Sequence, residues 1–308
     1  MKKIYTILIL LWTNNLFAQQ VPTYNQYVLN PFLINPAATG IDKYHKVMLT
    51  VRNQWSGIQG SPTTAFLAGS MPIGNTDNRF YAVGASIFHD RIGNFQRTSF
   101  NANTAVHLSI KKTIRLSFGA AVGGSSLNFD VQKVIANPND AALQTVPTNF
   151  IWQADVGLWA ESNFFFVGAS INQLASNSLF PNINEMPKYY TAIAGLKITS
   201  KDYENFAFVP SVFFRTGASQ QIDITGTFRY ADRAWLGGTY RLNGGYGVTI
   251  GGEIAENFVI SYYFESMTNT LARLGIMGAS SHEFSIGYRI KKQQSRRTYN
   301  RNFVNIHD

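Results

Sequence analysis

Apolar side chains alternate with small or polar ones along most of this chain. The runs QIDITGTFRY and HEFSIGYRI, for example, each place large apolar residues at every second position. Because side chains point alternately to the two faces of a β-strand, such runs predict strands with one apolar face. The opposite faces carry mostly Gly, Ser, Thr and Asn, with few of the Lys and Glu residues of a face in bulk water. The pattern therefore favours an all-β fold, a transmembrane antiparallel β-barrel with a polar interior.

The composition supports this class over the alternatives. Charged residues make up 14% of the chain, whereas typical soluble domains carry about 25%. Beyond the first eighteen residues, no apolar run reaches the ~18 residues that a membrane-spanning helix needs. A barrel spreads its hydrophobic residues over alternate positions, so it satisfies both observations. The chain contains no Cys, which excludes disulfides, thiol nucleophiles and thiolate metal sites.

Fourteen strand-like runs can be counted. They begin near Tyr44, Pro62, Arg79, Gln96, Thr113, Phe150, Asn163, Pro187, Asn205, Gln220, Arg233, Tyr246, Asn257 and His282. The connections after even-numbered runs are short, and the three longest (Ser125–Asn149, Asn172–Met186 and Ser266–Ser281) follow odd-numbered runs. Outer-membrane barrels have short periplasmic turns and longer outside loops. An even count with a periplasmic N-terminus therefore predicts that every long connection faces outside.

The chain divides into four parts. Residues 1–18 have a basic start, the apolar stretch Ile4–Trp12 and a small residue at Ala18, which together predict a cleaved signal peptide. Residues 19–43 form an N-terminal segment, 44–290 the barrel, and 291–308 a basic tail. Export makes nucleic acid an improbable partner for this tail, so we expect it to contact periplasmic or cell-wall-associated proteins through residues such as Arg296, Arg297 and Tyr299.

The stretch YVLNPFLINPAATG (Tyr27–Gly40) fits neither a strand nor a helix, because each Asn-Pro pair favours a turn and Pro cannot join a central strand. Its apolar residues still need burial. A fourteen-stranded barrel has a lumen wider than its wall side chains fill. We therefore predict that this segment plugs the periplasmic mouth of the barrel just before the first strand. The alternative is a periplasmic arm docked on a partner.

No arrangement of residues predicts catalysis, a metal site or a cofactor. The five His residues are scattered, and His89–Asp90 is better explained by the turn HDRIGN than by an acid/base pair. Gly237–Gly238 and Gly251–Gly252 fit curved or closely packed strands better than phosphate binding. Charged residues of both signs are expected inside the barrel as structural ion pairs, with a selectivity ladder as the alternative: Arg115, Arg229, Arg241 and Arg289 opposite Asp155, Asp223, Glu253 and Glu283.

Two long motifs lie near the start of the chain. The first, in NQYVLNPFLINPAATG, comprises Gln26, Tyr27, Asn30, Pro31, Asn35, Pro36 and Ala37. The second, in RNQWSGIQGSPTTA at the first strand and loop, comprises Arg52, Gln54, Trp55, Gly57, Gly60, Pro62 and Thr64. Both motifs resemble the PorP/SprF family of type IX secretion system membrane proteins of Bacteroidetes. The stretches HDRIGN, IRLSFGAAVG, DRAWLGGTYR and FSIGYRI also match, so the resemblance covers most of the chain.

This resemblance implies an outer-membrane barrel without catalytic residues. Similar proteins accompany the secretion or surface retention of specific cargo, often adhesins with a type B C-terminal sorting domain, and some are linked to gliding motility or to the periplasmic secretion ring. The alternative is a passive or hatch-gated channel for small or hydrophobic ligands, because some fatty-acid transporters carry a similar Asn-Pro-Ala stretch in an N-terminal hatch. The two alternatives differ in whether the barrel conducts.

Overall fold

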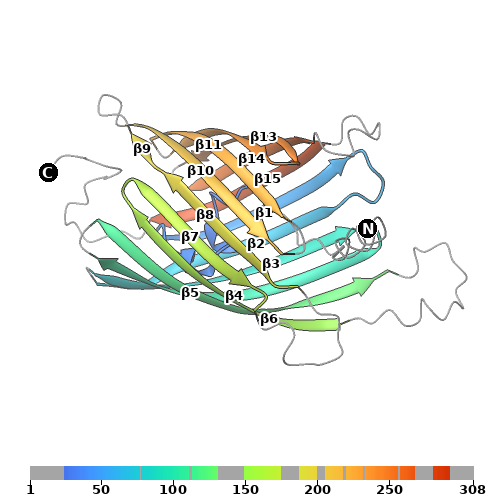
Figure 1. Ribbon diagram of the computed structural model, residues 1–308, viewed down its shortest axis with the longest axis horizontal. Helices are drawn as coiled ribbons and strands as arrows, with labels where there is room; N and C mark the ends of the chain where they lie inside the picture. Colours follow the sequence, from blue (N-terminus) through green and yellow to red (C-terminus); the bar gives the residue numbers. More distant parts are fainter. Residues whose placement is uncertain are drawn as a thin grey trace, which may run out of the picture.

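A computed structural model describes residues 24–76, 78–110, 113–130, 149–174, 187–199, 205–217, 220–231, 233–255, 257–267 and 280–291. They form one antiparallel sheet that curves into a barrel (Figure 1). Its strands are β1 (Tyr44–Ser56), β2 (Thr63–Thr76), β3 (Arg79–Ile92), β4 (Phe95–Ile110), β5 (Ile114–Phe129), β6 (Asn149–Ser162), β7 (Phe165–Asn172), β8 (Tyr189–Leu196), β9 (Ile198–Thr199), β10 (Phe206–Thr216), β11 (Gln221–Tyr230), β12 (Ala234–Arg241), β13 (Gly245–Ile254), β14 (Phe258–Met267) and β15 (Ser280–Lys291).

The first and last strands close the barrel. β1 pairs with β15 from Tyr44↔Lys291 onward, and the other strands pair with their neighbours in the sequence, except that β8 and β9 both pair with β10. β9 continues β8 along the same edge of β10, and the ladder between them is interrupted beside Pro210, which has no N–H to donate. β8 and β9 therefore count as one strand of the wall, and the predicted fourteen-stranded barrel is confirmed.

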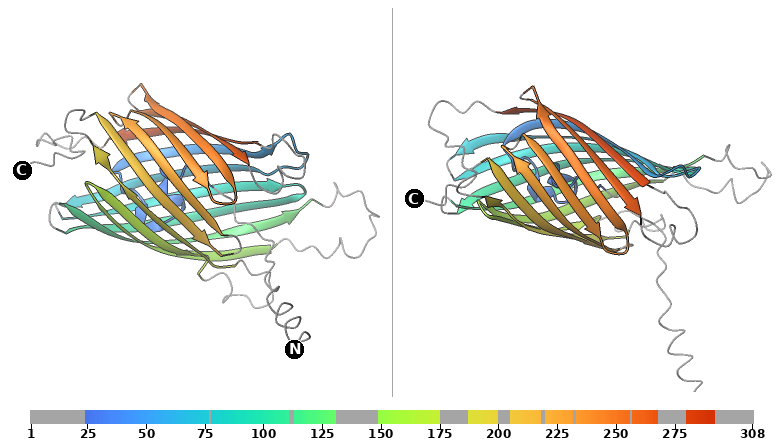
Figure 2. Two further views of the ribbon diagram at one scale, coloured as in Figure 1. Left: turned by 45° about the horizontal axis from the view of Figure 1, so that its top comes forward. Right: turned by 90° about the horizontal axis from the view of Figure 1, so that it is seen from above.

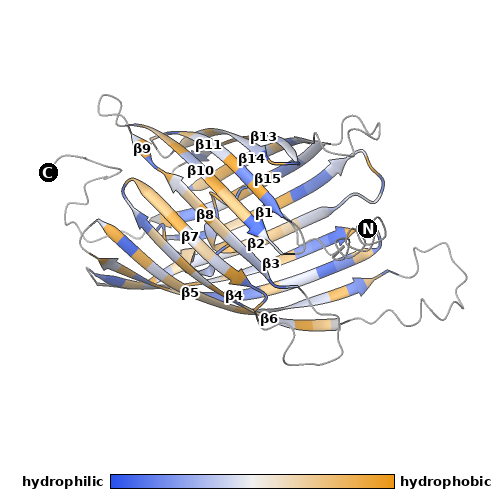
Figure 3. Ribbon diagram, viewed as in Figure 1, coloured by the Kyte–Doolittle hydropathy of each residue, from blue (hydrophilic) through white to orange (hydrophobic). Residues whose placement is uncertain are grey.

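The two faces of the wall differ as the alternation predicts. Outward residues such as Phe228 are exposed in the isolated chain (61%), whereas the inward neighbours Asp223 and Thr225 are buried. Figure 3 shows hydrophobic and hydrophilic residues alternating along the strands. Among the described residues, no helix has the length and apolar character required to span a bilayer.

The connections also separate as predicted. The connections at one end of the barrel, which we name the short-turn end, span two to six residues each, and three residues separate β4 from β5 there. The three longest connections leave from the opposite end, which we name the long-connection end, and most of their residues lie outside the described part. β5 extends to Phe129 rather than ending at Ser125, so that connection is shorter than its predicted bounds.

The interior contains the N-terminal segment, residues 24–43. It includes two short 3₁₀ helices, η1 (Pro31–Leu33) and η2 (Pro36–Ala38), and appears in blue inside the barrel in Figures 1 and 2. Its apolar side chains form the main buried cluster together with inward residues of the wall, such as Phe66, Trp159 and Phe213. The hydrophobic core of this protein is therefore centred on a segment that belongs to no strand.

Candidate functional site: the N-terminal segment in the barrel lumen

The N-terminal segment fills the lumen between the two ends of the barrel. Asn25 contacts Glu283, near the start of β15 and the long-connection end, while Lys43 leads directly into β1 at the short-turn end. The prediction that this segment plugs the barrel is confirmed. The segment extends farther than the predicted periplasmic mouth, because its first described residues reach the opposite half of the lumen.

Glu283 anchors the beginning of the segment. Its two carboxylate oxygens accept hydrogen bonds from the main-chain N–H groups of Asn25 (3.1 Å) and Gln26 (3.2 Å). The side-chain amide of Gln26 also donates to the Glu283 carbonyl (3.4 Å) and to Ser285 Oγ (3.1 Å). Hydrogen bonds to an ionised acceptor are the stronger kind, and here they satisfy two buried N–H groups outside any sheet.

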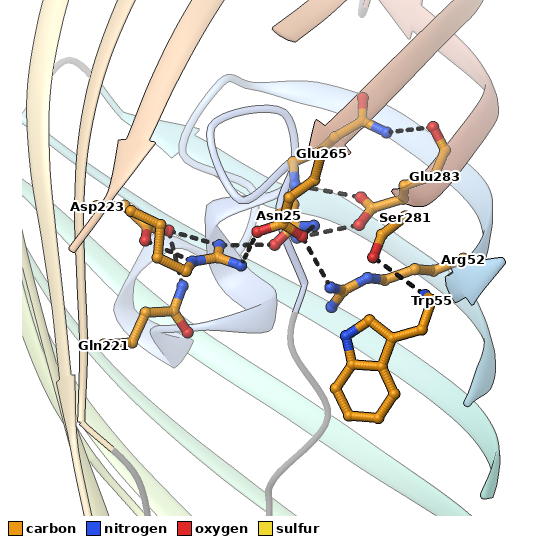
Figure 4. A network of polar contacts seen from close by, with 10 residues as sticks. Asn25, Arg52, Trp55, Gln221, Asp223, Glu265, Ser281 and Glu283 are labelled. Carbon is orange, nitrogen blue, oxygen red and sulfur yellow. Dashed lines mark hydrogen bonds and ion pairs between the residues drawn. The ribbon is translucent and has the colours of Figure 1, made fainter. Parts of the chain in front are cut away.

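An ion-pair network surrounds this anchor (Figure 4). Arg241 donates hydrogen bonds to the Asp223 carboxylate from Nε (2.8 Å) and Nη2 (2.9 Å), and its Nη1 donates to Glu265. The same Nη2 donates to the Asn25 side-chain oxygen (2.8 Å), and Arg52 reaches Glu265 from β1 (3.2 Å). The network therefore joins the segment to β1, β11, β12 and β14.

The charges in this network are almost fully withdrawn from solvent. Arg52, Asp223, Glu265 and Glu283 are all buried. A buried charge is costly unless it is paired and hydrogen-bonded, and removing one partner of such a pair usually costs about 3–5 kcal/mol. The segment and the network thus depend on each other, because Asn25 and Gln26 supply donors and an acceptor that the wall itself does not provide.

Tyr27 fixes the segment by ring stacking. Its ring lies 4.5 Å from that of Phe213 in a stacked arrangement, and its hydroxyl contacts Thr225 Oγ1 (3.4 Å). Burial raises the pKa of the Tyr27 phenol above its usual value, and the nearby Asp223 carboxylate adds to this effect. The phenol therefore stays neutral, which suits its position between an aromatic ring and a hydroxyl.

Asn35 joins the middle of the segment to the wall. Its side-chain N–H₂ group donates to the carbonyls of Leu158 (2.9 Å) and Ala169 (3.1 Å), while its Oδ1 accepts from the N–H of Ala37 (2.9 Å). Pro36 follows as the first residue of η2, where a missing N–H costs nothing. The second Asn-Pro pair thus has a physical role: Asn caps the short helix and bonds to two strands, and Pro starts the turn.

Glycines in the wall provide the space for this contact. A Cβ at Gly119 would lie 2.3 Å from the nitrogen of Ala37, and one at Gly157 would lie 2.0 Å from Asn35 Oδ1. Both positions are inside strands, where Gly is otherwise unfavourable. The segment packs directly on the backbone at these two positions, so a side chain larger than that of Gly would not fit there. Isolated Gly in a strand is a known signal of close approach, but the alternation pattern did not distinguish these two residues from other strand glycines.

Four carbonyls of the segment accept hydrogen bonds from side chains of the wall. Ile34 O accepts from Ser170 Oγ (2.8 Å) and Thr191 Oγ1 (3.0 Å). Other carbonyls bond to basic side chains: Thr39 O to His107 (2.8 Å), Ile41 O to Arg115 (3.2 Å) and Leu29 O to Lys46 (3.4 Å). Lumen-facing polar residues of the strands therefore serve to bind an irregular backbone.

The first motif of the resemblance lies in the N-terminal segment, and several of its residues make the contacts described above. Asn30 and Pro31 begin η1 as Asn35 and Pro36 begin η2, but Asn30 makes no side-chain cap, and its buried Oδ1 has no partner among the described residues. All seven residues of this motif lie in the lumen.

The second motif forms the end of β1 and its turn. Trp55, Gly57 and Gly60 adopt positive φ values (58°, 92° and 76°), which build the turn between β1 and β2. Trp55 N donates to Ser281 Oγ (3.3 Å), and Gln54 N to Pro62 O (2.9 Å). Thr64 and Arg52 are partners in the ladder between β2 and β1, and Thr64 Oγ1 donates to Asp90. Only Arg52 of this motif belongs to the network around the segment.

The predicted luminal charge pairs are right in part. Arg241 pairs with Asp223, and Arg289 with Glu253 (2.6 Å). Three other residues of the predicted set have partners from outside it. Arg115 pairs with Glu161 (2.8 Å), Glu283 binds the segment, and Asp155 accepts from Gln173 N (2.7 Å). Glu265, which links Arg52 to Arg241, was missed.

His89 and Asp90 do not form a pair. Successive residues of a strand face opposite sides, so His89 lies on the outer surface, where it bonds to Thr98 Oγ1 (2.9 Å), and Asp90 is buried in the lumen. Among the described residues there is also no cluster of potential metal ligands.

Two cavities lie against the segment. The smaller, of about 40 Å³, adjoins Asn25–Leu29 and is also lined by Thr225, Thr227, Trp235, Thr239, Thr249 and Tyr263. The larger, of about 90 Å³, lies toward the long-connection end and is lined by residues that include Tyr24, Phe66, Arg97, Asp155, Tyr189 and Arg215. One water needs roughly 10–15 Å³, so each cavity can hold a few waters or part of a small ligand.

Several predicted features fall outside the described residues. These are the signal peptide at 1–18, most of the three long connections, and the tail residues Arg296, Arg297 and Tyr299. Lys291, which the sequence placed in the tail, is the last residue of β15.

Comparison with known proteins places this architecture. The family model described as "Type IX secretion system membrane protein PorP/SprF" matches residues 16–288. No curated protein matched the sequence. Among solved structures, the chain is similar to the Pseudomonas putida toluene transporter TodX (10% identity, 89% of this chain and 95% of that one, TM-score 0.50) and to a KdgM porin (7% identity, 79% and 98%, TM-score 0.41). At such low identity the likeness to TodX supports the barrel fold alone.

Proposed function

The chain belongs to the PorP/SprF family of type IX secretion system membrane proteins, and from this membership we propose that it supports the secretion or surface anchoring of one specific, adhesin-type cargo protein. In this proposal the protein is exported by residues 1–18 and inserts into the outer membrane with its long-connection end outside. Cargo with a type B C-terminal sorting domain contacts the outer side, and the basic tail contacts periplasmic ring or cell-wall-associated proteins.

The observation that carries this proposal is the occupied lumen. Glu283, the contacts of Asn35 and the buried aromatic cluster hold the N-terminal segment across the barrel, and the two cavities described beside it are small. In this barrel the interior side chains bind the backbone of the N-terminal segment, and such a filled barrel is suited to be a rigid platform. A protein with this architecture acts through surfaces that lipid does not cover, which are its two ends.

The second candidate is a hatch-gated channel for small or hydrophobic ligands. The two cavities on the segment favour it, because together they border much of its length and combine apolar with polar lining residues. Single-channel conductance in planar bilayers separates the candidates. The platform predicts no steady open pore from the intact protein, and a large increase when residues 24–40 are deleted. Removal of residues 293–308 is the matched control and should change nothing.

Cargo localisation tests the primary proposal directly. A strain lacking the protein should lose its cargo from the cell surface, and the full-length chain should restore it. Shortening the connection 131–148 should release cargo into the medium while the level of barrel stays constant. Deleting residues 293–308 should instead reduce co-purification of periplasmic partners. Normal cargo retention in the null strain would refute the proposal, whereas normal retention after loop shortening would only remove that loop as the contact.

A further inference from the structure

The outer half of β6 has a free edge among the described residues. On one side, β5 pairs with β6 along its whole length, from Ile114↔Ser162 to Leu127↔Asn149. On the other side, β7 pairs only with Val156–Glu161. In the part of the chain that the structure describes, the residues of β6 nearest the long-connection end therefore have a strand on one side only.

The reason is a change of chain direction after β7. Gln173 adopts a positive φ (58°), and its N–H donates to the side chain of Asp155 (2.7 Å) instead of a strand carbonyl. The next residue, Leu174, donates its N–H to the carbonyl of Ala154 (2.8 Å). This is the last bond between the two segments in the described chain, so the ladder ends there.

The bond to Ala154 fixes which groups of β6 are left over. Main-chain groups of alternate residues point to the same side of a strand, so Phe150 and Trp152 direct their N–H and C=O groups away from β5, as Ala154 does. Ile151 and Gln153 direct theirs toward β5. The free edge thus presents two donors and two acceptors at the spacing of a β-ladder.

The side chains beside this edge form an aromatic surface. Phe150 and Trp152 face outward (41% and 46% exposed), with their rings 5.0 Å apart and edge to face. The ring of Phe100 lies 6.1 Å from that of Phe150. Aromatic girdles mark the membrane interfaces of such barrels, so the edge lies at the rim, where a polypeptide can reach it.

We propose that Phe150–Gln153 is a docking edge that takes up an extended strand from a second polypeptide. Unpaired strand edges are templates for strand addition, in which main-chain hydrogen bonds give the affinity and alternate side chains the specificity. The incoming strand should present apolar residues beside Phe150 and Trp152, and small polar residues on its lumen side. This inference rests on the proposed function, because it locates where a secretion partner is held.

Hydrogen exchange of the full-length protein in detergent micelles tests whether the edge is open. The amides of Phe150 and Trp152 should exchange at least 100-fold faster than those of Ile151 and Gln153, which are bonded to β5. Equal protection of all four amides would overturn the proposal, because it would mean that this chain or a second copy already occupies the edge.

Photo-crosslinking in cells with an intact secretion system tests the partner. A benzophenone amino acid at Phe150 should form an adduct with another polypeptide; the same probe at Phe228, whose strand is paired on both sides, should not. Trp152→Pro removes one free N–H without touching the β5 ladder, so it should reduce the adduct at least tenfold. Trp152→Ala keeps the N–H and should retain the adduct.

The outcomes separate this inference from the proposed function. Heat-modifiable migration on gels must first show that both Trp152 variants fold. Equal adduct yields in the two variants, an adduct with a second copy, or no adduct would each overturn the docking edge. Loss of cargo in the null strain would still support the secretion role in those cases. Conversely, an edge-dependent adduct in cells whose cargo is unaffected by loss of the protein would support the edge and refute the secretion role.

Discussion

Glu283 and Asn25 are separated by 258 positions in the sequence, yet the carboxylate of one accepts the main-chain N–H of the other. Glu283 lies in the strand that closes the barrel, and Asn25 lies at the start of the segment that fills it. The side chain that secures the segment therefore belongs to the seam of the wall.

Replacing Glu283 with Gln should loosen the start of the segment. An amide offers one acceptor oxygen, and its N–H₂ group would face a main-chain N–H. Each charge-assisted hydrogen bond contributes about 1.5–3 kcal/mol, so the start of the segment should detach from the wall far more often. We expect bursts of conductance in planar bilayers from a barrel that remains heat-modifiable. Glu253→Gln is the control, because Glu253 pairs with Arg289 in the wall. Silent recordings from both variants would contradict the anchoring role.

Asn35→Asp should destabilise the protein while preserving the shape of the site. The new carboxylate would keep the cap on Ala37 but would face the carbonyls of Leu158 and Ala169 without a donor. We expect a loss of about 2–4 kcal/mol, measured by urea unfolding in micelles. Asn94→Asp, in the turn between β3 and β4, should have little effect. Equal stability of the two variants would mean that Asn35 is not needed as a donor.

Gly157→Ala should displace the segment because the added methyl would overlap the side chain of Asn35. Overpacking of this kind costs about 1–3 kcal/mol. We expect a lower midpoint of thermal unfolding and greater cleavage of the segment by added protease. Gly238→Ala is the control, because it makes the same substitution within a strand but its Cβ would meet no atom within 4 Å. The prediction fails if the two variants unfold at the same temperature.

Cysteine labelling tests the orientation of the barrel. The chain contains no native Cys, so single substitutions report without background. Asn139→Cys and Asn177→Cys, in two long connections, should react with a membrane-impermeant maleimide on intact cells. Asn75→Cys, at the short-turn end, should react only after the outer membrane is opened. The reverse pattern would place the long connections in the periplasm.

Strand number and facing were predictable because they depend on local alternation. Runs such as QIDITGTFRY already show which side chains face lipid, and connection lengths fix the two ends without any three-dimensional information. Even the need to bury Tyr27–Gly40 followed from composition, because that stretch is apolar and contains two prolines that exclude it from a strand.

The contacts of the segment could not be predicted, because they join distant positions. Nothing near Glu265 indicates that it links Arg52 to Arg241, and register across several strands decides this. Likewise, Gly119 and Gly157 look like ordinary strand glycines until the segment is in place. The path of the segment depends on which polar wall residues meet its carbonyls, and alternation alone specifies only that such residues face inward.

The seam contact also has a consequence for biogenesis. The first described residues of the chain are bound by Glu283 and Ser285, which belong to the last strand to be synthesised. A folding intermediate that lacks β15 can neither close the sheet against β1 nor bind the start of its N-terminal segment. Closure of the wall and anchoring of Asn25 and Gln26 are therefore coupled steps. We expect a chain truncated before β15 to leave both the seam and the start of the segment unformed.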